Sequence, residues 1–252
     1  MAQAFITFQF TAQDAIHQSQ IETYEFTQDL LSQHLDTLGG VPPETTPNQL
    51  TADQIEVLSS IHAATSSTPL SFTSPGLHPP STLVLNLFSN VAPKAVTNFL
   101  RLCDGSKGVS KASKKPLHYL GNRVHRIIEG YIIQWGDIVK GDGSSGDSIY
   151  GGKFNDEPQA LKLPISRGSL VMANSGKHSN TSQVFLVLSN DAERIRKNMQ
   201  GKHVVLGHVY GMGVGDDLLD PVAKESVGVF ERLDTVIDGT ELLVKNCGVL
   251  RE

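Results

Sequence analysis

The sequence predicts a mainly β protein with a separate helical segment near its N-terminus. Short runs rich in β-branched and aromatic residues recur between Val124 and Val209, and Gly, Asn, Asp and Pro separate them. Helical periodicity is confined to a few segments, two of which lie before residue 64. Many short strands with few helices are typical of a barrel or a sandwich, so we expect one of these architectures.

The N-terminal part begins with a predicted strand and continues into two predicted helices. Ala4–Thr11 is aromatic and β-branched with partial alternation, which indicates a strand. Residues 22–38 place apolar side chains at helical spacing, and a Gly-Gly pair then favours the end of the helix. Thr51 and Gln54 form a capping-box pattern that predicts a helix extending to about Ala63.

The next elements lead into the β-rich half. Residues 64–80 are rich in Ser, Thr and Pro and indicate a linker or an exposed loop. Ser81–Ser89 alternates like a strand, and Pro93 suits the first turn of a helix that ends before a glycine. Val229–Val236 is a plausible second helix of this half, and Glu241–Leu250 is expected to end the chain as a strand.

The charge distribution divides the chain near residue 94. The first Lys or Arg is Lys94, and residues 1–93 carry eight Asp or Glu, so this part has a charge of −8. The remainder has 21 basic and 18 acidic residues, or +3. Such asymmetry predicts two units with different surfaces. Because the whole chain has a net charge of −5 and a pI of about 6.0, bulk electrostatics do not favour nucleic-acid binding.

Cysteine usage favours a reducing, intracellular location, with the cytoplasm expected first and the nucleus as the alternative. Cys103 and Cys247 are the two cysteines, too few for a disulfide framework and without metal-ligand spacing. The N-terminus lacks the basic flank of a signal peptide, and no run of about 18 apolar residues predicts a membrane span. We therefore expect no metal, no cofactor and no membrane association.

Several separated motifs occur in a fixed order along the chain. They are VHRIIEGYIIQWGDIV at Val124–Val139, SIYGGKFNDEP at Ser148–Pro158, SLVMANSGKHSNTSQVFL at Ser169–Leu186, GKHVVLG at Gly201–Gly207 and NCG at Asn246–Gly248. The first resembles the signature segment of the cyclophilin-type peptidyl-prolyl cis-trans isomerases, and the others follow in the order that this family has. The resemblance covers about residues 4–12 and 81–252.

The resemblance implies a closed eight-stranded antiparallel barrel capped by two helices. Residues 1–12 and 81–252 would form this barrel domain, and residues 13–80 would be an acidic helical insertion, with its Ser/Thr/Pro-rich linker, between the first two strands. Ala4–Thr11 would then pair with Ser81–Ser89, since loss of the first strand would expose a barrel edge. The alternative is an ordinary N-terminal tail that contributes no strand.

The activity of that family is rotation about X-Pro peptide bonds. Partial double-bond character opposes the rotation by about 18–20 kcal/mol. A catalyst needs an apolar pocket for the proline ring, groups that hold the flanking backbone, and a donor that favours a lone pair localised on the imide nitrogen. By resemblance Arg126 is that donor, and Gln134 and Asn174 are its catalytic neighbours. The alternative for Arg126 is a surface salt bridge.

The resemblance also implies a set of substrate-binding residues. For Ile132 and Phe185 the alternative is ordinary core packing. The implied partners are proline-containing peptides or proteins, bound by a monomer without metal or cofactor. The substrate-binding residues would be Tyr131, Ile132, Ala173, Gln183, Phe185, Asn198, Met199 and His203.

The chain departs from the family pattern at the implied site. Tyr131 stands where the family has another aromatic residue, so its hydroxyl needs a partner or water. Trp135 replaces a usual glycine and is expected either on the barrel exterior or crowding the site behind Arg126. Asn198 stands where many members have a tryptophan that donates to cyclosporin, so we expect weak cyclosporin binding.

The segment Lys107–Tyr119 resembles the longer loop of the divergent-loop members of the family. Those members carry two cysteines where Cys103 and Cys247 stand, proposed as a redox pair. The alternative is a pair of buried reduced cysteines that act as small apolar residues.

Two other functions are compatible with the sequence. The groove could hold a proline-containing partner without useful turnover, which would make the chain a binding module or scaffold. The acidic insertion could instead dock a partner protein, although apolar stripes such as those it carries more often pack on each other or on the barrel. The pattern GDGSSG at Gly141–Gly146 matches a dinucleotide motif literally, but no helix is predicted after it, so a dinucleotide site is not expected.

Overall fold

The computed structural model describes residues 1–77 and 79–252, which divide into two compact units. The larger unit contains Met1–Thr11 and Pro80–Glu252, and the smaller unit contains Ala12–Pro79. Among the helices of the described residues, none combines the length and the apolar character that a bilayer crossing requires.

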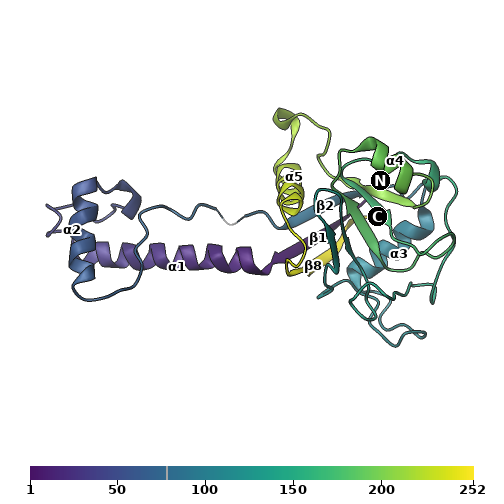
Figure 1. The fold of residues 1–252 in the computed structure, drawn as a ribbon, viewed down its shortest axis with the longest axis horizontal. Helices are drawn as coiled ribbons and strands as arrows, with labels where there is room; N and C mark the ends of the chain where they lie inside the picture. The colour runs from purple at the N-terminus through teal and green to yellow at the C-terminus, as the bar shows by residue number, and fades with distance from the viewer. Residues whose placement is uncertain (78) are drawn as a thin grey trace. The chain divides into compact units, whose positions relative to one another are not determined.

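The larger unit is built on one eight-stranded antiparallel sheet (Figure 1). Its strand order is β3-β4-β6-β5-β7-β2-β1-β8. The strands are β1 (Ala2–Phe10), β2 (Thr82–Leu87), β3 (Arg126–Ile128), β4 (Ile132–Trp135), β5 (Ser169–Met172), β6 (Val184–Val187), β7 (Val205–Val209) and β8 (Leu242–Arg251).

The expectation of a mainly β architecture holds, but the expectation of a closed barrel is wrong. The sheet is an open half-barrel whose edges, β3 and β8, lie 10 Å apart. The segment before β3 contacts β8 at an isolated bridge between Arg123 and Leu243, next to a hydrogen bond from the Val124 N–H to the Leu242 carbonyl at 2.9 Å. The chain then diverges into β3, which is three residues long, so no continuous ladder closes the sheet.

Strand β1 is an internal strand of this sheet. It pairs antiparallel with β2 from Ala2 opposite Leu87 to Thr7 opposite Thr82, and its other edge pairs with β8. Every second side chain of β1 is buried, as expected for a strand with one face on the core. The pairing that the sequence predicted between its first two strands is therefore present.

Three helices belong to the larger unit: α3 (Pro93–Asp104), α4 (Ala192–Asn198) and α5 (Pro221–Asp234). Helix α3 packs on β1 and β8, and α5 packs on β2 and β7 (Figure 1). Pro93 opens α3 and Gly105 follows it with a left-handed φ of 65°. Helix α5 begins before the predicted Val229, because Asp220 caps it by accepting from the Ala223 N–H at 2.7 Å. The short, polar α4 was not predicted.

Trp135 lies in the interior of the half-barrel. Its side chain is fully buried, and its ring meets Phe8 edge-on at a centroid distance of 5.7 Å. Strand alternation explains this position, because Ile133 and Trp135 of β4 face the core while Ile132 and Gln134 face outward. Both sequence-based expectations for Trp135, an exterior position and crowding of the site, are wrong.

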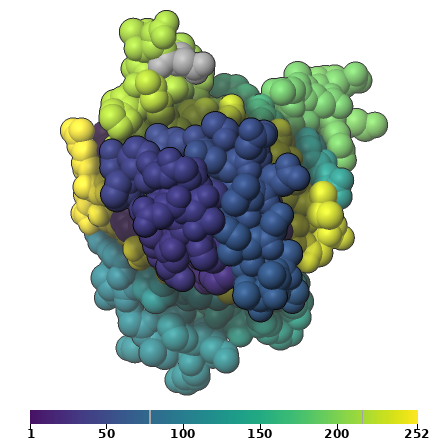
Figure 2. Space-filling model, turned by 90° about the vertical axis from the view of Figure 1, so that its left-hand side faces the viewer, coloured from purple at the N-terminus to yellow at the C-terminus, as the bar shows by residue number. Residues whose placement is uncertain are grey.

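The smaller unit contains two helices, α1 (Thr11–Gln33) and α2 (Ala52–Ala63), and α2 runs across α1 near its C-terminal end (Figure 1). Figure 2 shows the end of this unit where α2 lies. Helix α1 starts directly after β1, earlier than the predicted residue 22. Helix α2 has the predicted bounds, and its capping box pairs the Thr51 N–H with Gln54 Oε1 at 2.9 Å. The buried apolar core of this unit consists of Leu31, Leu38, Val41, Leu50 and Leu58.

We propose that residues 13–80 are an insertion in the sheet domain. Because Thr7 lies opposite Thr82, the ends of β1 and β2 are close enough for a short turn. Replacing residues 12–79 by a glycine-containing turn should leave the free energy of unfolding within about 1 kcal/mol of the full chain, since the sheet keeps all its strands. Urea denaturation followed by circular dichroism measures this.

The matched control is a chain that lacks residues 1–79. It also loses β1 and leaves β2 and β8 without their shared neighbour, so it should not unfold cooperatively. If the turn variant behaves like this control, the insertion proposal is wrong.

Candidate functional site

The strand register places three predicted site residues in one row. Arg126 of β3 lies opposite Gln134 of β4, and Gln134 lies opposite Phe185 of β6. Residues directly opposite each other in an antiparallel sheet project to the same face. Arg126, Gln134 and Phe185 therefore share the outer face, which is the face opposite to Trp135.

Arg126 presents a free guanidinium on that face. The residue is exposed, and no described residue forms an ion pair or a side-chain hydrogen bond with it. Its backbone is held by the ladder to Gln134. The surface salt bridge that was the alternative for Arg126 is thus not formed with any described residue, and the cation remains available to a bound molecule.

An apolar cluster lies on the outer face of the sheet, apart from the interior core. It joins five of the predicted substrate-binding residues with side chains of β5, β6, β7 and α4. Each of the five keeps less than a tenth of its surface exposed. An apolar cluster on the outer face is what the predicted binding of a proline ring would need. The five are Tyr131, Ile132, Ala173, Phe185 and Met199.

His203 borders this cluster as a neutral side chain. Its ring meets Phe185 edge-on at a centroid distance of 5.2 Å, and its Nδ1 is 3.0 Å from the Met172 carbonyl oxygen. Burial lowers the pKa of His203 below its ordinary value. The imidazole is therefore uncharged at neutral pH and packs against Phe185.

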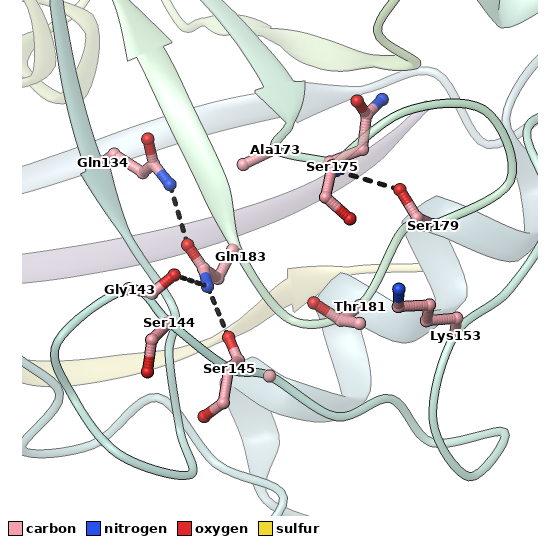
Figure 3. A pocket seen from close by; sticks show the side chains of 12 residues that line it. Gln134, Gly143, Ser144, Ser145, Lys153, Ala173, Ser175, Ser179, Thr181 and Gln183 are labelled. Atoms are coloured by element: carbon pink, nitrogen blue, oxygen red, sulfur yellow. Dashed lines mark hydrogen bonds between the residues drawn. The ribbon is translucent and has the colours of Figure 1, made fainter.

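A polar pocket of about 280 Å³ lies beside the apolar cluster (Figure 3). Gln134, Ala173, Asn174 and Gln183 line it, so the structure brings together four of the predicted residues here. Sequence reasoning did not assign the other lining residues. These are Gly143, Ser144, Ser145, Gly146, Lys153, Ser175, Ser179 and Thr181.

Two glutamines join the strands to the glycine-rich loop Gly141–Gly146. Gln134 Nε2 donates to Gln183 Oε1 at 2.7 Å, and Gln183 Nε2 donates to the backbone carbonyls of Gly143, at 2.9 Å, and Ser145 (Figure 3). Both donors of the Gln183 amide are thus engaged by the loop. This arrangement makes Gln183 a support for the pocket wall. Asn174 also lines the pocket, and its Nδ2 donates to the Lys202 carbonyl at 2.9 Å.

Two buried carboxylates hold the loop in shape. Burial opposes their ionisation, but hydrogen bonds outweigh it. Asp137 accepts from the backbone N–H groups of Gly143 and Ser145, among others, and its pKa lies well below the usual range. Asp147 accepts from the Ser110 hydroxyl at 2.5 Å and has a pKa of about 2. Asp147 thereby ties the glycine-rich loop to the segment Lys107–Tyr119.

Asn198 is the last residue of α4 and is exposed. Its Nδ2 lies 3.5 Å from the Tyr131 hydroxyl, which gives that hydroxyl a partner. All the predicted catalytic and substrate-binding residues therefore gather around the row of Arg126, Gln134 and Phe185.

The two cysteines lie elsewhere. Cys103 and Cys247 are free, buried side chains of the interior core. Burial raises the pKa of both thiols, to about 11 for Cys247. Each is therefore protonated and a weak nucleophile at neutral pH. The redox pair stays a prediction, separate from the site.

Comparison with known proteins agrees with this geometry. A family model described as cyclophilin type peptidyl-prolyl cis-trans isomerase/CLD matches residues 77–241. The chain belongs to the cyclophilin family. Among the described residues, no group of three His, Cys, Asp or Glu is placed to hold a metal ion.

Two curated relatives of this cyclophilin are both named peptidyl-prolyl cis-trans isomerase. The peptidyl-prolyl cis-trans isomerase CYP21-1 of Arabidopsis thaliana is 48% identical over 128 residues, which are 50% of this chain and 54% of that protein. The peptidyl-prolyl cis-trans isomerase cyp11 of Rhizopus delemar is 38% identical over 169 residues, which are 67% of this chain and 46% of that protein. The chain therefore spans about half the length of the curated relatives it matches.

Asp147 should make the chain sensitive to acid. Its pKa of about 2 in the folded state lies below the ~3.9 of an unfolded aspartate. Ionised Asp147 thus stabilises the fold above about pH 4, and this contribution is lost as the pH falls toward 2. We expect Asp147→Asn to lower the free energy of unfolding at neutral pH by about 2 kcal/mol and to flatten its acid dependence. Urea unfolding at several pH values measures both effects.

Asp238→Asn is the control, because Asp238 is an exposed aspartate outside the loop. It should change the free energy of unfolding by less than about 0.5 kcal/mol. An acid dependence in Asp147→Asn as steep as that of the unmodified chain would contradict the assignment.

Proposed function

We propose that the chain is an active peptidyl-prolyl cis-trans isomerase that acts on X-Pro bonds of peptides and proteins and assists their folding or conformational switching. The observation that carries this proposal is the free guanidinium of Arg126, in one row with Gln134 and Phe185 and beside an apolar cluster. The family membership and the names of the two relatives support it.

The reaction breaks no bond, so the site has only to favour a twisted imide over a planar one. The apolar cluster around Phe185 would take the proline ring, which fixes one side of the bond. Rotation localises the lone pair on the imide nitrogen, and Arg126 would stabilise that electron density with its fixed charge and donors. Because the twisted state offers a better acceptor than the planar amide, this contact is stronger in the transition state.

Polar residues beside the cluster would hold the substrate chain on either side of the proline. Gln134 and Asn174 line the polar pocket and offer amide groups to a peptide backbone. Gln183 would keep the wall of that pocket in place through the loop contacts described above. His203 and Met199 would border the ring-binding surface, and Ala173, which belongs to both the pocket and the cluster, would leave room for the chain to pass.

The remaining parts of the proposal concern location and assembly. We propose a monomer in the cytoplasm or nucleus that binds proline-containing polypeptides. The two free thiols support a reducing compartment. The competing function is a module that binds such partners without useful turnover.

Arg126→Ala separates an enzyme from a binding module. We expect it to lower kcat/KM for a proline peptide by about 10²–10³, because one preorganised donor to the transition state is lost. The kcat/KM of Arg126→Lys should fall between the values of the unmodified chain and of Arg126→Ala, since an ammonium keeps the charge but not the planar fork of donors. A proline-peptide exchange assay measures these values. The free energy of unfolding should change by less than about 0.5 kcal/mol, because Arg126 is exposed.

Arg123→Ala is the control, as it removes an exposed arginine three residues earlier in the chain. Its kcat/KM should stay within about twofold of the unmodified chain. Exchange no faster than the uncatalysed rate in the unmodified chain, with peptide binding intact, would establish the binding module instead.

Asn198 should weaken cyclosporin binding, since an asparagine cannot supply the indole surface and N–H that many family members have there. We expect Asn198→Trp to tighten cyclosporin binding by about tenfold, measured by calorimetric titration. Asn198→Phe adds aromatic surface without a donor and should give a smaller gain. Binding by the unmodified chain as tight as that of Asn198→Trp would refute this expectation.

A further inference from the structure

An arginine of α4 covers the ring of Tyr131. The Arg194 guanidinium carbon lies 3.7 Å from the centroid of that ring, well within the range of a cation–π contact. Tyr131 is only 7% exposed although it lies on the outer face of the sheet. Within the described part of the chain, the Arg194 guanidinium has no ion pair. Its contact with Tyr131 is therefore its main interaction.

Helix α4 is anchored so that Arg194 stays over the ring. Asp191 caps the helix by accepting from the Arg194 N–H at 2.9 Å. Ile195, the next residue, and Met199, which follows the helix, are buried in the same apolar cluster as Tyr131. Arg194 thus lies on a short helix fastened at its N-cap and along its apolar side.

The backbone of Tyr131 is fixed independently of α4. Its N–H donates to the Ile128 carbonyl at 2.9 Å, and its carbonyl accepts from the N–H groups of Leu188, at 2.9 Å, and Ser189, at 3.3 Å. The freedom that remains is rotation of the side chain. Arg194 on the ring face and Asn198 near the hydroxyl limit this rotation from the same helix.

We propose that Arg194 is a positioning residue that holds the Tyr131 ring as a wall of the proline-binding cluster. The inference rests on the proposed function of that cluster. Arg194 acts on the substrate only through the Tyr131 ring. That ring contacts the proline ring equally well whether the imide bond is planar or twisted. Its loss therefore weakens uniform binding, which raises KM and leaves kcat nearly unchanged.

A double-mutant cycle on the full chain tests this proposal. It compares the unmodified chain, Arg194→Ala, Tyr131→Leu and the double variant, using one proline peptide for the exchange assay and for direct titration of its Kd. Arg194→Ala should raise KM and Kd by about two- to fivefold, the range of an exposed cation–π contact. In the Tyr131→Leu background, Arg194→Ala should change KM and Kd by less than about 1.5-fold, because no aromatic ring remains to be held.

Two further variants separate positioning from general charge. Arg194→Lys keeps a cation over the Tyr131 ring, and its KM should lie within about twofold of the KM of the unmodified chain. Arg196→Ala removes an exposed cation from the same helix and should leave KM and Kd unchanged.

Each outcome decides the proposal. An unchanged KM and Kd in Arg194→Ala, an equal effect with and without Tyr131, or an equal effect in Arg196→Ala would overturn it while leaving the proposed function intact. Binding without turnover in the unmodified chain would refute the catalytic function, and the Kd cycle would still report on Arg194. Neither binding nor turnover in the unmodified chain would refute both.

Discussion

The antiparallel register of β3, β4 and β6 is the constraint on which the candidate site depends. It brings a guanidinium, an amide and an aromatic ring to one face without the help of a flexible loop. A slip of one residue in β4 would turn Gln134 inward and Trp135 outward. The packing of Trp135 against Phe8 opposes that slip, so the interior core protects the geometry of the outer face.

Around this row, hydrogen bonds shape the pocket from segments without regular structure. Gln183 joins β6 to the glycine-rich loop, and Asp137 accepts from backbone N–H groups that the loop would otherwise leave unpaired. Asp147, which follows the loop, accepts from the backbone N–H groups of Ser113 and Gly152. Buried carboxylates are stable here because each receives several donors in place of water. The loop is thereby held as a wall for the polar pocket beside Ala173, which the apolar cluster shares.

The smaller unit interrupts the sheet domain in sequence without interrupting the sheet. Strand β1 lies between β2 and the edge strand β8, so the residues before the interruption supply an internal strand of the sheet. The apolar side chains of the smaller unit form their own cluster, which leaves its eight acidic residues without any Lys or Arg in the same segment. The two units therefore differ in the charge of their side chains.

The sequence by itself determined the family, the bounds of α2 and the identity of the residues around Arg126, because capping boxes and continuous motifs are local signals. It could not determine that the sheet stays open, since closure depends on how β3 and β8 approach across more than 100 residues. The sequence also did not reveal that Trp135 faces the interior. Nor did it reveal that Arg194 lies over the ring of Tyr131, because Arg194 belongs to a short polar helix with weak periodicity. Tertiary structure decided these points, because each depends on contacts between segments far apart in the chain.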